Sequence, residues 1–163
     1  MLPTVPRLRL SLLELLDNED PLRRGRGRAL TWNENLKDLK ESVRKNLQAV
    51  LNTRRLEDAV PPEFEHCEDS LLTYGLPDFA GFTVADNDDR ERLGAAIGRA
   101  IRRFEPRLTG LKVVADNGDP KKREGVIHYR IDAWLRIEPV PEPVTFDTVL
   151  EASKWHFLVA YDR

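Results

Sequence analysis

Residues 125–139, GVIHYRIDAWLRIEP, alternate with a period of two. A period of two places alternate residues on opposite faces of a strand. One row is apolar: Ile127, Tyr129, Ile131, Ala133, Leu135 and Ile137. The other row is His128, Arg130, Asp132, Trp134 and Arg136. This pattern predicts a long antiparallel strand whose apolar face is covered and whose other face meets water.

Three shorter segments extend this strand into a sheet. Residues 111–115 precede it across an Asn117-Gly118 turn with a basic tip at residues 121–123. Alternating residues after it predict a third strand (Val144, Phe146, Thr148, Leu150) and a fourth (Trp155, Phe157, Val159), with a turn near residues 151–153. The predicted sheet is therefore four-stranded, mostly antiparallel, and covers residues 111–160.

The segment before the sheet is helical in pattern. In residues 31–55 the apolar residues recur at helical spacing: Leu36, Leu39, Val43, Leu47, Val50 and Leu51. Asn33 or Asn35 is the expected N-cap, and Arg54 with Arg55 suits the negative end of the helix dipole.

A second helix is predicted to start at Asp88-Asp89-Arg90-Glu91, which fits a capping box. It continues through one apolar row: Leu93, Ile97, Ala100, Ile101 and Phe104. A loop rich in proline and glycine separates the two helices. Helices followed by strands predict an α+β fold, with the helices packed on one face of the sheet.

At 163 residues the chain is long enough for one domain with a substantial core, which we assign to residues 31–163. Residues 1–30 form a predicted N-terminal arm. Its short helix has a capping box from Ser11 to Glu14 and a stripe of Leu12, Leu13, Leu15 and Leu16. A basic link, Arg23–Arg28, follows. The leucine stripe either packs on the domain's own core or docks on a partner, and the pattern leaves both possibilities open.

Charge and composition exclude several classes of function. The 26 basic and 28 acidic residues leave a net charge of -2, so no nucleic acid or anionic membrane is expected as a partner. No apolar run reaches the roughly 18 residues that could cross a bilayer, and the N-terminus lacks a signal-peptide pattern. The cytoplasm is the expected location. Cys67, the single cysteine, excludes an intrachain disulfide.

No motif indicates catalysis, a metal or another cofactor. Residues 63–69 collect acidic, histidine and cysteine side chains, but adjacent residues rarely converge on one ion. Residues 86–89 lack the central glycine and terminal glutamate of a calcium loop. His66, His128 and His156 stand in unrelated settings, and no pair of carboxylates is singled out. The chain is therefore not expected to be an enzyme.

Glu105-Pro106-Arg107 is the segment that most invites a functional interpretation. Pro106 cannot continue the second helix, so Glu105 is placed at the helix C-terminus, where the dipole disfavours an anion. Either Arg107 compensates the carboxylate as a local ion pair, or a partner's cation or amides do so.

Four segments, in order, carry a resemblance to a known family. Glu105-Pro106-Arg107 resembles the Glu-Pro-Arg signature of the baseplate wedge family, which includes TssE of type VI secretion systems and the wedge protein that initiates the phage sheath. SLLELLD (residues 11–17) resembles the leucine-rich motif of TssE. Residues 51–54 resemble the end of the family's first core helix, and residues 74–79 its Gly-x-Pro-Asp-Phe loop.

The resemblance implies a structural role in a contractile injection machine. Glu105, Pro106 and Arg107 would then dock on the baseplate core bundle, built from TssF and TssG, with TssK as a further baseplate partner. The sheet would offer strand pairing to the sheath proteins TssB and TssC, since an open sheet edge supplies unpaired amides and carbonyls. The edge that serves is not specified by the sequence.

Two other functions are alternatives. The family has been labelled lysozyme-like, which would make the chain a peptidoglycan hydrolase. Stress-response anti-adaptors share the fold family, which would make it a regulatory binding module. Neighbouring genes for sheath and baseplate proteins would favour the structural role over both.

Overall fold

The computed structural model describes residues 32–55, 62–67, 70–79, 81–83, 86–115 and 125–161. Helix α2 (Trp32–Asn52) is followed by two short 3-10 helices, η1 (Pro62–Cys67) and η2 (Leu71–Thr73), and by helix α3 (Asn87–Phe104). Four strands complete the chain: β1 (Leu108–Ala115), β2 (Val126–Leu135), β3 (Glu142–Glu151) and β4 (His156–Tyr161). The predicted α+β class is confirmed.

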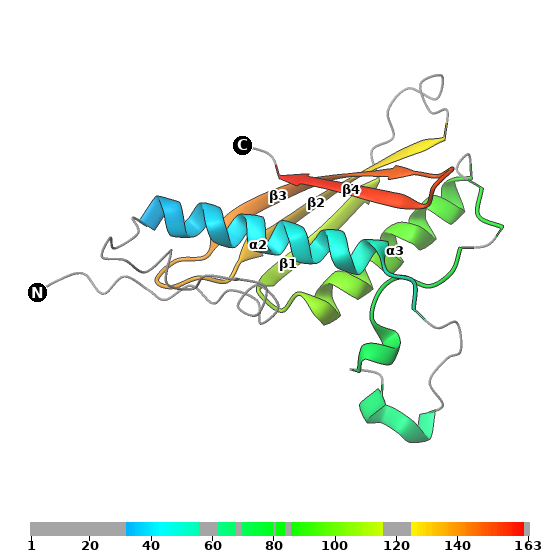
Figure 1. The fold of residues 1–163 in the computed structure, drawn as a ribbon, viewed down its shortest axis with the longest axis horizontal. Coiled ribbons are helices and arrows are strands. Elements are labelled where there is room, and N and C mark those ends of the chain that lie inside the picture. Colours follow the sequence, from blue (N-terminus) through cyan, green and yellow to red (C-terminus); the bar gives the residue numbers. More distant parts are fainter. Residues whose placement is uncertain are drawn as a thin grey trace, which may run out of the picture.

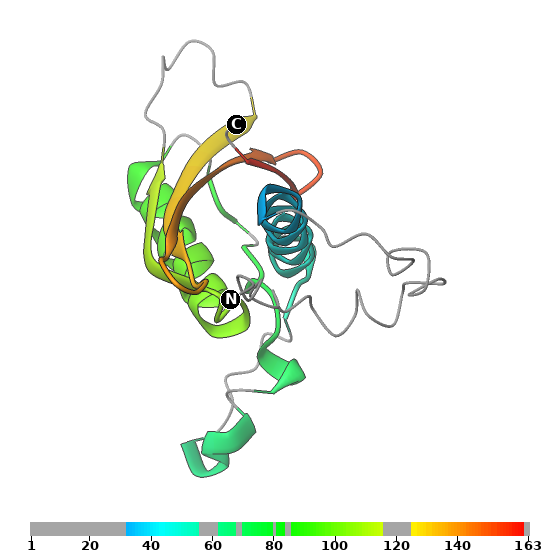
Figure 2. The same ribbon diagram turned by 90° about the vertical axis from the view of Figure 1, so that its left-hand side faces the viewer.

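The sheet is a meander in which neighbours in sequence are neighbours in space. Its order is β1-β2-β3-β4, with every pairing antiparallel. Helix α3 packs on β1 and helix α2 packs on β4, so the two helices lie against opposite edge strands of the sheet. Figure 2 shows how the sheet curves around α2. β1 and β4 are the two edge strands.

The core lies between the helices and the predicted apolar face of the sheet. Tyr129, Ile131 and Leu135 of β2 are at most 1% exposed, and they belong to one cluster with the apolar rows of both helices. His128, Arg130 and Trp134 on the other face of β2 are exposed. The alternation read from the sequence is therefore the alternation of burial, because one face of the sheet meets the helices and the other meets water.

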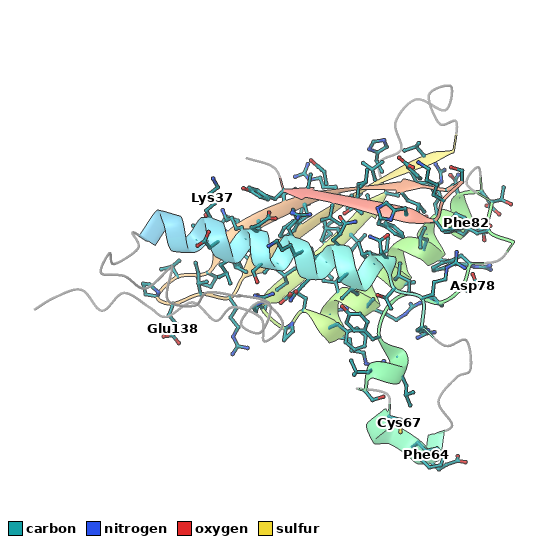
Figure 3. All side chains as sticks on the ribbon, in the orientation of Figure 1. Lys37, Phe64, Cys67, Asp78, Phe82 and Glu138 are labelled. Atoms are coloured by element: carbon teal, nitrogen blue, oxygen red, sulfur yellow. The ribbon has the colours of Figure 1, made fainter. Side chains whose placement is uncertain are left out.

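The segment that holds η1 and η2 projects away from the body of the domain (Figure 1). Phe64 and Cys67, labelled in Figure 3, lie at its far end. Leu71 is 86% exposed and Leu72 52% exposed, so this segment adds little to the core. The sequence predicted a loop here but neither 3-10 helix.

Both predicted helix caps are wrong. Asn33 and Asn35 lie inside α2, which extends back to Trp32. The N-cap of α3 is Asp86, whose side chain accepts a hydrogen bond from the Asp88 amide at 3.0 Å, so the helix starts earlier than the Asp88 capping box predicts. Arg54 and Arg55 lie beyond the end of α2. Local hydrogen-bonding residues are abundant near both starts, and the sequence alone does not distinguish among them.

Two strand boundaries also differ from the prediction. β1 begins at Leu108 rather than at residue 111. Trp155 lies in the turn before β4, with a positive φ of 49°, and not in the strand. Its ring stacks on Phe79 at 6.0 Å and meets Phe82 edge-on at 5.6 Å. This aromatic packing draws Trp155 out of the strand's alternation.

Among the helices of the described ranges, none has the length and apolar character needed to span a membrane.

Candidate docking site

The Glu-Pro-Arg corner, residues 105–107, joins the end of α3 to the start of β1. Glu105 is the C-cap of α3, and its amide donates to the Ile101 carbonyl at 2.8 Å. Pro106 lacks an amide hydrogen and ends the helix, and the chain turns through residues 106–107. The Leu108 amide then donates to the Glu105 carbonyl at 3.1 Å, which closes the turn at the first residue of β1.

The Glu105 side chain is buried and paired within the chain. It is 1% exposed. Arg107 Nε donates to Oε1 and Nη2 donates to Oε2, each at 2.7 Å, and the Arg107 amide also donates to Oε1 at 3.3 Å. This two-pronged geometry matches the planar guanidinium to the carboxylate. Of the two compensations that the sequence left open, the local ion pair is present.

Helix α2 is fastened to the same corner. Asn46 Nδ2 donates to Glu105 Oε2 at 3.2 Å, and Arg107 Nη1 donates to Ser42 Oγ at 2.9 Å. The Arg136 amide, just after β2, donates to the Arg107 carbonyl at 2.7 Å. The corner thus connects α2, α3, β1 and the end of β2. Asn46 and Ser42 were missed in the sequence because they lie 59 and 65 residues from their partners.

Pro106 and part of Arg107 are the portions of the corner that reach the surface. Pro106 is exposed, and the Arg107 side chain is 18% exposed. The Glu105 carboxylate is held beneath them. Any partner that meets this corner would therefore meet Pro106 and the edge of Arg107, with Glu105 fixing their positions.

The loop of residues 74–79 lies against the corner. The Tyr74 ring meets Phe104, the last residue of α3, edge-on at 4.9 Å. Burial, and then the nearby charge of Glu105, raise the pKa of the Tyr74 hydroxyl. Tyr74 is therefore a neutral neighbour of the ion pair at physiological pH.

Gly75 connects this loop to the end of α2. Its φ is +101°, and a Cβ there would lie 2.2 Å from the Thr53 carbonyl oxygen, so only glycine fits. The Leu76 amide donates to that same oxygen at 2.8 Å, and the Arg55 amide donates to the Leu76 carbonyl at 2.9 Å. The loop of residues 74–79 thus bonds directly to the end of residues 51–54, and it reaches the corner of residues 105–107 through Phe104, the residue before Glu105.

A row of polar side chains on α2 closes the outer edge of β4. We call Arg44, Gln48 and Asn52 the capping row. Asn52 both accepts from the Phe157 amide at 2.8 Å and donates to the Phe157 carbonyl at 2.9 Å, and Gln48 Nε2 donates to that same carbonyl. Gln48 Oε1 accepts from the Val159 amide at 2.9 Å, and Arg44 Nη1 donates to the Val159 carbonyl at 3.2 Å. The capping row takes the place of a fifth strand.

The remaining residues singled out in the sequence differ in whether the structure describes them. Leu12, Leu13, Leu15 and Leu16 lie outside the described residues. His128 and His156 are exposed on strands. Within the described ranges, no three His, Cys, Asp or Glu side chains come together as a metal site would require.

Comparison with known proteins gives one family. Residues 37–140 match the family model described as baseplate wedge protein gp25, which is well over half of the chain. The matched range includes most of α2, the loop with Gly75, all of α3, the Glu-Pro-Arg corner, β1 and β2. No curated protein matches the chain. No solved structure matches it. The chain belongs to the baseplate wedge protein gp25 family.

Proposed function

We propose that this chain is a TssE-like subunit of a type VI secretion baseplate, working in the cytoplasm as a structural, non-enzymatic part. In this role it docks on the TssF–TssG core through the Glu-Pro-Arg corner, contacts TssK within the baseplate, and initiates assembly of the TssB–TssC sheath. The proposal rests on membership of a baseplate wedge family and on the ordered motifs of residues 11–17, 51–54, 74–79 and 105–107.

The single observation that carries the docking role is the way the corner is braced. Burying a carboxylate costs several kcal/mol in desolvation, which an ion pair and further hydrogen bonds must offset. Replacing a buried ion pair by apolar residues is often neutral or stabilising, so stability alone gives a weak reason for such a pair. A rigid charged corner with Pro106 outside and Glu105 inside is better explained as a preorganised contact, because preorganisation lowers the entropy cost of binding.

The leucine stripe of Leu12, Leu13, Leu15 and Leu16 is proposed as a second contact with the baseplate. An amphipathic segment this short is not a stable helix by itself, so its apolar face gains order by packing on another surface. Deleting residues 1–30 is expected to weaken the complex without unfolding the domain of residues 31–163.

Co-purification with TssF and TssG tests the docking role. Pro106→Glu changes the exposed part of the corner and leaves the buried pair intact, so it is expected to lower binding at least ten-fold with little change in melting temperature. Arg107→Ala is expected to lower both. Arg92→Ala is the matched control, because Arg92 is 79% exposed near the other end of α3. Normal binding by folded Pro106→Glu and Arg107→Ala variants would contradict docking through this corner.

A further inference from the structure

The projecting segment carries apolar side chains that the rest of the domain leaves in contact with water. Leu71 is 86% exposed and Leu72 is 52% exposed. With Tyr74 and Cys67 they line a hollow of about 730 Å³, and its lining also includes residues 53–55 at the end of α2. We call Leu71, Leu72, Tyr74 and Cys67 the leucine shelf. Contiguous exposed apolar surface of this kind marks an interaction site.

A small basic pocket of about 70 Å³ adjoins the leucine shelf. Arg55 lines both hollows, and Arg99 and Arg103 of α3 line the pocket. Among the described residues no Asp or Glu lines either hollow, and neither Arg55 nor Arg99 forms an ion pair. Arg54 beside them pairs with Asp78 at 3.9 Å. Guanidinium groups gathered around one pocket favour an anion there, and a carboxylate matches their geometry.

Residues 11–17, SLLELLD, combine the two kinds of group that these hollows call for. Residues four apart share a face of a helix, so a helix that starts at Ser11 places Leu12 beside Leu16, and Leu13 beside Asp17. The apolar stripe is thus flanked by one carboxylate, as the leucine shelf is flanked by the basic pocket. The segment therefore matches both hollows at once.

The chain is long enough to bring this segment to the shelf. Helix α2 starts at Trp32, and the shelf lies at the other end of that helix. A helix of 21 residues is about 31 Å long. Residues 18–31 span up to about 46 Å when extended, so Asp17 can reach the basic pocket without strain in the link.

We propose that residues 11–17 bind the leucine shelf of their own chain, with Asp17 in the basic pocket. The leucines cover the shelf, and the Asp17 carboxylate pairs with Arg55 and Arg99. Leu12 then lies toward Cys67, at the far end of the projecting segment (Figure 3). The free subunit in this way keeps its leucine stripe out of water. Displacement of the stripe by the baseplate rests on the proposed function, whereas the contact itself does not.

The same chain is a better occupant than a second copy. A segment tethered to its site meets it at an effective concentration of about millimolar, which a separate molecule reaches only in concentrated solution. A short leucine segment that binds weakly as a free peptide is therefore held when it is part of the chain. The contact should accordingly be independent of protein concentration.

Cys67, the single cysteine, allows the contact to be measured by disulfide formation in the full chain. Leu12→Cys supplies the second thiol at the end of the stripe that faces Cys67. A disulfide requires the two Cα atoms to lie within about 7 Å, so it reports close approach. Mild oxidation should give a disulfide-linked monomer, detected by gel electrophoresis without reductant and by mass spectrometry.

Charge variants in the Leu12→Cys background test the basic pocket. Asp17→Arg or Arg99→Asp alone should slow formation of the disulfide at least ten-fold. The two changes together should restore at least half of the original rate, because the opposite charges have exchanged places. Arg92→Asp is the control, since Arg92 is exposed on the same helix outside the pocket, and it should leave the rate unchanged.

Three results would overturn the contact: no disulfide-linked monomer, a rate that Arg99→Asp does not change, or a disulfide-linked dimer whose yield rises with concentration. Addition of TssF and TssG should slow the reaction, because the baseplate takes up the stripe. Binding of TssF and TssG at an unchanged rate would overturn the displacement step. If the disulfide forms as predicted but TssF and TssG do not bind at all, the proposed function fails and the contact stands.

Discussion

Arg107 holds Glu105 in a two-bonded ion pair across Pro106, with Nε to Oε1 and Nη2 to Oε2 both at 2.7 Å. The pair spans a single residue, yet it fixes where a helix ends and a strand begins. Through Asn46 and Ser42 it also fixes where α2 lies against them. A motif of three residues therefore sets the relative positions of three elements.

Removing one member of this pair should be far more costly than removing a surface pair. Glu105→Ala leaves Arg107 without its carboxylate in a largely buried site, so we expect a loss of about 3 kcal/mol in the free energy of unfolding. Glu142→Ala, which removes the partly exposed pair with Lys40, should cost less than about 1 kcal/mol. Urea unfolding measures both. Equal effects would show that the corner does not brace the fold.

Removing the capping row should open the β4 edge. In a Gln48→Ala, Asn52→Ala double variant, the Phe157 and Val159 amides lose their acceptors and should exchange with deuterium at least ten-fold faster. The freed edge should also promote concentration-dependent self-association, detected by light scattering. Lys45→Ala on the exposed face of α2 is the control. Slow exchange in the double variant would mean that something other than α2 protects β4.

Alanine substitutions at Gly75 and Gly81 distinguish the cost of a steric clash from the cost of backbone strain. Gly75 and Gly81 both have positive φ, +101° and +84°, so alanine at either should cost about 1–2 kcal/mol in strain. A Cβ at Gly75 would also clash with the Thr53 carbonyl, whereas nothing lies within 4 Å of one at Gly81. Gly75→Ala should therefore be more destabilising than Gly81→Ala by roughly 2 kcal/mol. Thermal unfolding of the two variants gives the difference directly, and similar values would refute a tight junction between this loop and α2.

Tyr129 gives the fold a dependence on alkaline pH. Burial raises the pKa of its hydroxyl well above the ordinary tyrosine value, so the phenol stays neutral in the fold while the unfolded chain ionises above pH of about 10. Its contribution is therefore complete below that pH and is lost as the pH rises. The advantage of the native chain over Tyr129→Phe, about 1 kcal/mol for the hydrogen bond to the Arg90 carbonyl, should shrink by about 1.4 kcal/mol per pH unit above 10. Unfolding at pH 7 and pH 11 checks it; a constant difference would mean that Tyr129 ionises in place.

The sheet and the two helices could be predicted because burial follows local periodicity. Ile127, Ile131 and Leu135 alternate with exposed residues in the sequence as they do in β2. Leu93, Ile97 and Ile101 line one face of α3 for the same reason. Pro106 marked the end of α3 because proline cannot continue a helix.

What could not be predicted depends on contacts between distant segments. The capping row joins residues 105 to 115 positions apart, and nothing local marks Arg44, Gln48 or Asn52 as different from other polar residues on a helix face. Burial of the Arg90 Nε without a hydrogen-bond partner among the described residues is likewise visible only once α3 has been placed on the sheet. Trp155 lies outside its predicted strand because its ring packs against Phe79 and Phe82, a contact that the periodicity of the sequence does not indicate.

The most direct test of the central claim is a cryo-electron microscopy map of this chain bound to purified TssF and TssG. We predict that the TssF–TssG bundle contacts Pro106 and Arg107, with Glu105 still paired beneath them. A map in which the bundle binds another face, and the Glu-Pro-Arg corner stands in solvent, would contradict the account.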